Sequence, residues 1–127
     1  MKKITISIII IILLSILIGA YSYQKIEGDT IASHWDIDGE VNGYMSKFWG
    51  VFLFPIMLIG MCILFSIIPK IDPLKKNIKK FKKEYNIFVF SMILFLFYVF
   101  ILTILANLKY NFNMTTMIMP AMGLLFF

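Results

Sequence analysis

Charge is scarce in this sequence of 127 residues, because only 15% of them are charged and 61% are apolar. Soluble globular domains have about 25% charged and about 45–50% apolar residues, so the composition excludes that class. A chain this short cannot bury so many Ile, Leu and Phe side chains in a water-soluble core. It is also far too apolar to be disordered. The remaining class is an integral membrane protein.

Arginine is missing, since all 12 basic residues are Lys, and the only cysteine is Cys62. A nucleic-acid-binding module would carry Arg and a basic face with interleaved aromatic residues, so we expect no nucleic acid partner. A single cysteine in an apolar run provides neither an intrachain disulfide nor a metal cluster. The sequence also has no HExxH, GxSxG or CxxC motif and no Gly-rich phosphate loop. We therefore expect a protein that is not an enzyme and has no cofactor.

Three stretches of more than 20 residues contain no charged residue at all. A helix needs about 20 mainly apolar residues to cross the lipid bilayer, so each stretch is long enough. Long runs without alternation are not strands of a membrane barrel. The sequence therefore predicts an all-α membrane protein in contact with the lipid bilayer, with spans at about 4–23, 48–68 and 86–107 and a partial fourth span at 114–127.

The fourth apolar stretch is short, because the 14 residues from Met114 to Phe127 give a helix of about 21 Å. No interfacial Lys, Trp or Tyr follows it, although complete spans usually end with such anchors. We expect residues 1–127 to be a single membrane domain that is a fragment or a naturally truncated form. A half-inserted C-terminal helix is the alternative.

Lysines are distributed unevenly between the two long loops. Loop 69–85 has seven Lys and two acidic residues, whereas loop 24–47 has two Lys and five acidic residues. Lys-rich loops remain in the cytoplasm, so we predict a cytoplasmic N-terminus, a cytoplasmic 69–85 loop and an outer 24–47 loop. Alternatively, Lys2, Lys3 and the first apolar run form a cleaved secretory signal, which would not change the topology after Lys47.

The Lys-rich loop has the pattern of a short amphipathic helix, because Leu74, Ile78, Phe81 and Tyr85 recur at helical spacing. The simplest interpretation is a topology-setting loop that lies on anionic lipid. The alternative is a docking surface for an acidic cytoplasmic partner, formed by Lys75, Lys76, Lys79, Lys80, Lys82 and Lys83.

The outer loop is richer in turn-forming residues than a membrane connection requires. Asp38-Gly39 and Asn42-Gly43 are tight-turn signals, and residues 31–35 have the composition of a short strand. We therefore expect a compact, hairpin-like loop on the outer surface. Ser46 is expected to cap the helix that follows.

The residues of this loop that could hold a metal are His34, Asp36, Asp38 and Glu40. An EF-hand that began at Asp36 would need Gly and a carboxylate where Val41 and Lys47 stand. One His with scattered carboxylates is also a weak zinc pattern. We therefore expect no metal, and a hydrogen-bonded His34 that holds the loop. A metal-dependent membrane enzyme or transporter subunit remains a third hypothesis, which metal analysis of the purified protein would test.

The same loop resembles a known family in its residues His34-Trp35, Gly39, Asn42-Gly43-Tyr44 and Ser46-Lys47. They are similar to the outer-loop signature of the SdpI family of immunity proteins, whose N-terminal part is a membrane domain of unknown function. The family pattern is approximately Ile-Pro-Thr-His-Trp/Phe, three variable residues, Gly, two more, Asp/Asn-Gly-Tyr, one variable residue and Ser-Lys. Ala32 stands where the pattern has Pro. Longer members continue with a C-terminal half of two further spans, which this sequence does not include.

The resemblance implies a plasma-membrane protein of a bacterium or archaeon that protects against a secreted toxin or signals its presence. Our first hypothesis is a non-enzymatic protein that binds an extracellular peptide toxin through the outer loop, with the binding residues His34, Asp36, Asp38, Gly39, Asn42, Gly43, Tyr44 and Lys47. We also expect Lys47 to pair with an acidic residue of the loop. The second hypothesis is a signal relay, in which the Lys-rich loop captures a cytoplasmic transcriptional repressor.

Overall fold

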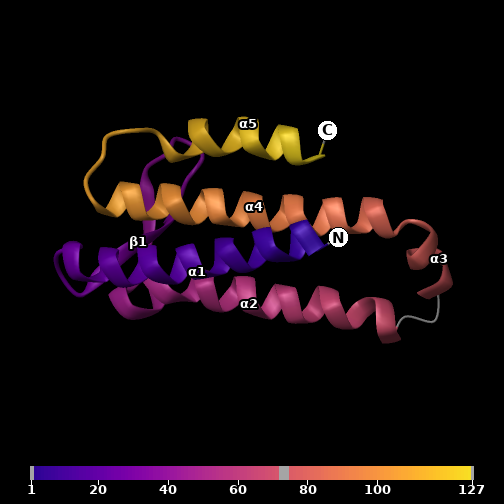
Figure 1. Ribbon diagram of the computed structural model, residues 1–127. Coiled ribbons are helices and arrows are strands. Elements are labelled where there is room, and N and C mark those ends of the chain that lie inside the picture. Colours follow the sequence, from indigo (N-terminus) through magenta and orange to yellow (C-terminus); the bar gives the residue numbers. More distant parts are fainter. Residues whose placement is uncertain (1, 72–74, 127) are drawn as a thin grey trace.

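The chain forms an up-and-down bundle of helices with a small two-stranded sheet at one end (Figure 1). The computed structural model describes residues 2–71 and 75–126, without the side chains of residues 2, 75 and 78. The elements in chain order are α1 (Lys2–Lys25), β1 (Thr30–Trp35), β2 (Val41–Ser46), α2 (Lys47–Ile71), α3 (Lys75–Lys80), α4 (Lys82–Asn107) and α5 (Met114–Phe126). By length and composition, α1, α2 and α4 can cross a membrane, whereas α5 is a shorter apolar helix. The predicted fold class is confirmed.

The two ends of the bundle differ in character. The sheet lies at the end where α1 and α4 finish, and the Lys-rich α3 lies at the opposite end (Figure 1). A charge-free helix of more than 20 residues leaves no place for a polar connection except at its ends, so loops and charges gather there. The chain is a multi-pass membrane protein with a polar structure at each end.

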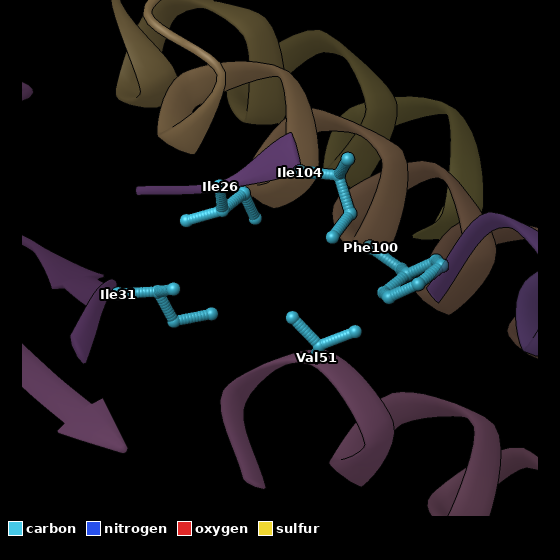
Figure 2. Packing of buried hydrophobic residues seen from close by; sticks show 5 residues of the cluster. All are labelled: Ile26, Ile31, Val51, Phe100 and Ile104. Atoms are coloured by element: carbon cyan, nitrogen blue, oxygen red, sulfur yellow. The ribbon is translucent and has the colours of Figure 1, made fainter. Parts of the chain in front are cut away.

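Two clusters of buried apolar side chains fill the bundle. The cluster next to the sheet consists of Ile26, Ile31, Val51, Phe100 and Ile104 (Figure 2). The second cluster lies toward α3 and consists of Ile11, Leu58, Val89 and Ile93. Many other large apolar side chains of α1 and α2 are exposed, as expected for surfaces that lipid covers.

Helix α1 approaches its neighbours closely because small residues line its inner face. Ser15 and Ser22 are fully buried, and a Cβ atom on Gly19 would lie 3.2 Å from a methyl group of Val51 on α2. The Ser15 hydroxyl donates a hydrogen bond to the Ile12 carbonyl at 2.7 Å, so it is satisfied within the bundle. Small residues are typical of close contacts between membrane helices.

The Lys-rich loop differs from the amphipathic helix that its pattern predicts. Helix α3 ends at Lys80, Phe81 forms a turn, and α4 begins at the next residue. The apolar stripe is therefore divided: Phe81 is exposed, whereas the Tyr85 hydroxyl donates to the Phe65 carbonyl of α2 at 2.8 Å. The predicted single helix is therefore interrupted at Phe81, because α4 begins before its predicted span and carries Tyr85 into the bundle. Leu74 and the side chains of Ile78 and Lys75 lie outside the described residues.

Candidate functional site: the hairpin cap

Residues 30–46, which we call the hairpin cap, form an antiparallel pair closed by a turn at Asp36. One carboxylate oxygen of Asp36 accepts the N–H groups of Asp38 and Glu40, both at 2.9 Å. The Gly39 N–H donates to the Asp36 carbonyl at 3.0 Å. Gly39 has a φ of 84°, a left-handed conformation that glycine adopts without steric penalty. The expected hairpin is present, and Asp36 organises its turn.

His34 is part of the strand pairing. A hydrogen bond joins its Nδ1 to Oδ1 of Asn42 on the facing strand, and Gly43 is its register partner. A Cβ atom on residue 43 would lie 2.8 Å from the Cβ of His34, so the strands can approach this closely only where residue 43 is glycine. His34, Asn42 and Gly43 therefore form one cross-strand unit, with His34 hydrogen-bonded as expected.

Asn107, the last residue of α4, fixes β1 to the bundle. Its side-chain Oδ1 accepts the Ala32 N–H at 2.8 Å, and its Nδ2 donates to the Ala32 carbonyl at 3.0 Å. The same Nδ2 donates to the Thr103 carbonyl within α4 at 2.9 Å. Because Ala32 is buried, the amide of Asn107 supplies the partners that its backbone would otherwise lack.

Asn113, directly before α5, fixes the turn of the hairpin cap in a similar way. Its Nδ2 donates to the Asp38 carbonyl at 3.0 Å, while its Oδ1 accepts the Thr116 N–H at 2.9 Å and so caps α5. The Thr115 hydroxyl donates to the Asp36 carbonyl at 2.8 Å. The start of α5 and the hairpin cap therefore hold each other in place.

The sequence analysis did not identify Asn107 or Asn113 as part of this site. The available signal was the position of each Asn at an end of an apolar run. A side-chain amide is favourable there only if it has a polar partner. Asn113 also precedes two threonines in the pattern of a helix N-cap.

Lys47 connects the two helices on either side of the hairpin cap. Its ammonium donates to the Ile26 carbonyl, just beyond α1, at 3.0 Å and lies 4.5 Å from the centre of the Tyr23 ring. Its backbone N–H donates to the Asp29 carbonyl at 2.8 Å. The expectation that Lys47 pairs with a carboxylate was wrong. The carbonyls at a helix C-terminus lack intrahelical partners and carry partial negative charge, so they attract the ammonium group.

Ile31 anchors the hairpin cap in the apolar cluster of Figure 2. Its side chain is 1% exposed. A Cβ atom on Gly50 of α2 would lie 2.3 Å from the terminal methyl group of Ile31. The absence of a side chain at residue 50 therefore provides the space that Ile31 occupies.

A cavity of about 400 Å³ lies between the hairpin cap and helices α2, α4 and α5. Pockets of this size accommodate small ligands or a few side chains of a partner. The cap contributes His34, Trp35 and Ile37, among others, and α5 contributes a group of methionines. Ile37 at the turn is 86% exposed, although it borders this apolar cavity.

The eight predicted binding residues occupy different parts of this structure. Two of them, His34 and Asp36, line the cavity. Asp38 and Gly39 form the turn, and Asn42 and Gly43 belong to the cross-strand unit. Tyr44 is exposed on β2, and Lys47 lies at the junction of α1 with α2. Among residues 2–71 and 75–126, no three His, Cys, Asp or Glu side chains lie together as a metal site.

The lysines predicted as a docking surface lie at the other end of the bundle, on α3 and the start of α4. The exposed ones are Lys76, Lys79, Lys80, Lys82 and Lys83, and the side chain of Lys75 is outside the described residues. Two of them, Lys79 and Lys82, line a second cavity together with Lys70. The predicted set is therefore divided into lysines that border a cavity and lysines that do not.

Residues 10–59 match a domain of unknown function, DUF1648. The matched segment begins within α1, contains the whole hairpin cap and ends within α2. No curated protein and no solved structure matches the chain. The helix ends that carry Asn107 and Asn113 lie outside the matched segment.

Proposed function

We propose that this protein is a non-enzymatic component of the plasma membrane whose hairpin cap binds an extracellular peptide toxin. The observation that carries the proposal is the apolar cavity beside Ile37, whose side chain is almost fully exposed. A preformed, mainly apolar cavity with a few polar side chains in its wall is the usual form of a binding site, and Ile37 is an exposed member of that wall. The resemblance to the SdpI immunity proteins and the match to DUF1648 around the cap support the same role.

The charges near the cavity favour a cationic ligand. Asp36 lines the cavity, and Asp38 and Glu40 are exposed in the same turn, on either side of Gly39. Carboxylates around an apolar site attract positive ligands and help to orient them. The proposed ligand is therefore a peptide that carries both apolar side chains and positive charge.

The proposal is tested in bacterial cells that are sensitive to secreted cationic peptide toxins. Cells that express the protein are challenged with a panel of such toxins, and survival is compared with that of cells carrying an empty vector. We expect protection against at least one toxin, and we expect Ile37→Ser to reduce it strongly at equal expression. Ile37 is exposed, so the substitution should leave the fold intact.

Tyr44→Ser is the matched comparison and also tests the predicted binding role of Tyr44, which is 67% exposed on the same hairpin but does not line the cavity, so that binding in the cavity does not require it. Protection should survive this substitution. Loss with Tyr44→Ser alone would place the binding surface on β2 instead of the cavity. Unchanged survival with Ile37→Ser would contradict a role for the cavity.

A signal relay is the second candidate, favoured by the exposed lysines at the end opposite the cap. In this version the Lys-rich segment holds an acidic transcriptional repressor at the membrane while a toxin occupies the cap. Charge reversal of Lys76, Lys80 and Lys83, which lie outside the second cavity, should release the repressor in a pull-down. Retention of the repressor by that variant would argue against the relay.

We also propose that the N-terminus and α3 are cytoplasmic and that the hairpin cap faces outward, because the lysines gather at the α3 end. Ser33 and Asn77 are both exposed and lie at opposite ends of the bundle. In a Cys62→Ser background, Ser33→Cys should react with a membrane-impermeant maleimide in intact cells, and Asn77→Cys only after lysis. The reverse pattern would invert the topology.

A further inference from the structure

A cavity of about 630 Å³ lies at the α3 end of the bundle, far from the hairpin cap. It is formed where the first half of α1 meets the end of α2 and the start of α4. Its inner wall is apolar and includes Ile8, Ile12, Phe65 and Val89. The cavity therefore lies in the part of the membrane next to the Lys-rich surface.

Three lysines line one end of this cavity, Lys70, Lys79 and Lys82. They come from three different elements, α2, α3 and α4. In the described part of the chain none of them forms an ion pair with a carboxylate, and Glu84 lines a different cavity, together with Phe81 and Phe88. Positive charge thus converges at this end without a described counter-ion.

The apolar part of the cavity extends from the lysines toward the middle of the bundle. Its lining runs from Lys70 to Cys62 along α2 and from Ile4 to Ile12 along α1. Eight residues of helix correspond to about 12 Å at a rise of about 1.5 Å per residue. A site with converging positive charge at one end and an apolar slot of this depth fits an anionic amphiphile.

We propose that this cavity binds one anionic phospholipid, whose phosphate lies at Lys70, Lys79 and Lys82 and one of whose acyl chains follows the apolar wall. Basic pockets between membrane helices on the cytoplasmic side are known to select anionic headgroups. A soluble phosphate compound would leave the apolar wall empty. A diffuse attraction of lipid to all the lysines of the loop would not distinguish those at the cavity from their neighbours.

The chain offers a matched pair of variants for this test. The cavity variant is K70Q/K79Q/K82Q, and the control variant is K76Q/K80Q/K83Q, which removes the same charge from lysines that do not line the cavity. Full-length protein in mild detergent is incubated with equal amounts of phosphatidylglycerol and phosphatidylcholine, and the bound lipid is measured by native mass spectrometry.

The unmodified chain should retain phosphatidylglycerol preferentially. The cavity variant loses the charge-assisted contacts of three lysines with the phosphate, so its preference should fall at least about tenfold. The control variant should change it by less than about twofold. An equal loss in both variants, or no preference in the unmodified chain, would overturn the proposal.

Cys62 provides a second measurement that needs no lysine variant, because it is the only cysteine and lines the cavity. Bound lipid should slow its alkylation by N-ethylmaleimide several-fold in bilayers with phosphatidylglycerol, compared with bilayers of phosphatidylcholine. Inorganic phosphate added to phosphatidylcholine bilayers should give no protection. Equal rates in the two bilayers, or equal protection by phosphate, would contradict a lipid site.

Discussion

Gly39 and Gly28 make it possible to measure how firmly the hairpin cap is attached to α5. The two glycines have nearly the same left-handed φ, 84° and 85°. A Cβ atom on residue 39 would lie 2.5 Å from the side-chain amide of Asn113, whereas a Cβ atom on residue 28 would have no atom within 4 Å. Substitution by alanine therefore introduces the same backbone strain at both positions but a steric clash only at residue 39.

The expected free energies follow from these contacts. Alanine in a left-handed conformation costs about 1–2 kcal/mol, which is the whole effect expected for Gly28→Ala. In Gly39→Ala, Asn113 must move and lose its bonds to the Asp38 carbonyl and the Thr116 N–H. Each of these contributes about 1 kcal/mol. Gly39→Ala should therefore destabilise the protein by about 3–4 kcal/mol.

Unfolding of the purified protein by sodium dodecyl sulfate in mixed micelles, followed by tryptophan fluorescence, provides the measurement. In an Asn113→Ala background the clash is absent, so Gly39→Ala should then destabilise the protein no more than Gly28→Ala does. Equal destabilisation by the two glycine substitutions in the unmodified background would refute the proposed contact between the turn and α5.

Three further predictions concern the other attachments of the hairpin cap. Asn107→Leu leaves the buried backbone groups of Ala32 without partners and should destabilise the protein by roughly 2–3 kcal/mol, with faster hydrogen exchange of the Ala32 amide. Gly50→Ala overfills the site of Ile31 and should cost about 1–3 kcal/mol in the same unfolding assay, part of which Ile31→Val should restore. Lys47→Gln retains a donor for the helix-end carbonyl but loses the cation–π contact, so its expected cost is about 1 kcal/mol, and an unchanged stability would show that this contact contributes nothing.

Local sequence patterns were sufficient to predict the helices and the hairpin. Runs without charge predict membrane helices because a charged side chain is unfavourable anywhere in the bilayer core, independently of the contacts that the rest of the chain makes. Turn dipeptides such as Asp38-Gly39 likewise act within a few residues. The ends of the helices were less predictable, because α4 begins at Lys82, before the charge-free run, and has charged residues in its first turn.

The arrangement of the candidate site depends on contacts between distant parts of the chain, and these could not be read from one sequence. Asn107 and Asn113 reach the hairpin cap across 75 residues. Lys47 has five acidic residues nearby in the loop, yet it binds a carbonyl that only the packing of α1 beside α2 brings within reach. The residues that looked like one binding surface are therefore divided between turn, strand pairing and helix junction.

The double clasp of Asn107 on Ala32 has a consequence for modular engineering. A graft of residues 10–59 onto a foreign bundle would transfer the hairpin but leave behind the amide that brackets its first strand and the amide that steadies its turn. A graft that keeps the hairpin in place must therefore include both asparagines, at positions equivalent to the end of α4 and the start of α5. Because residues 108–112 join the two asparagines, a change in the length of this connection should shift the hairpin without any change in the hairpin itself.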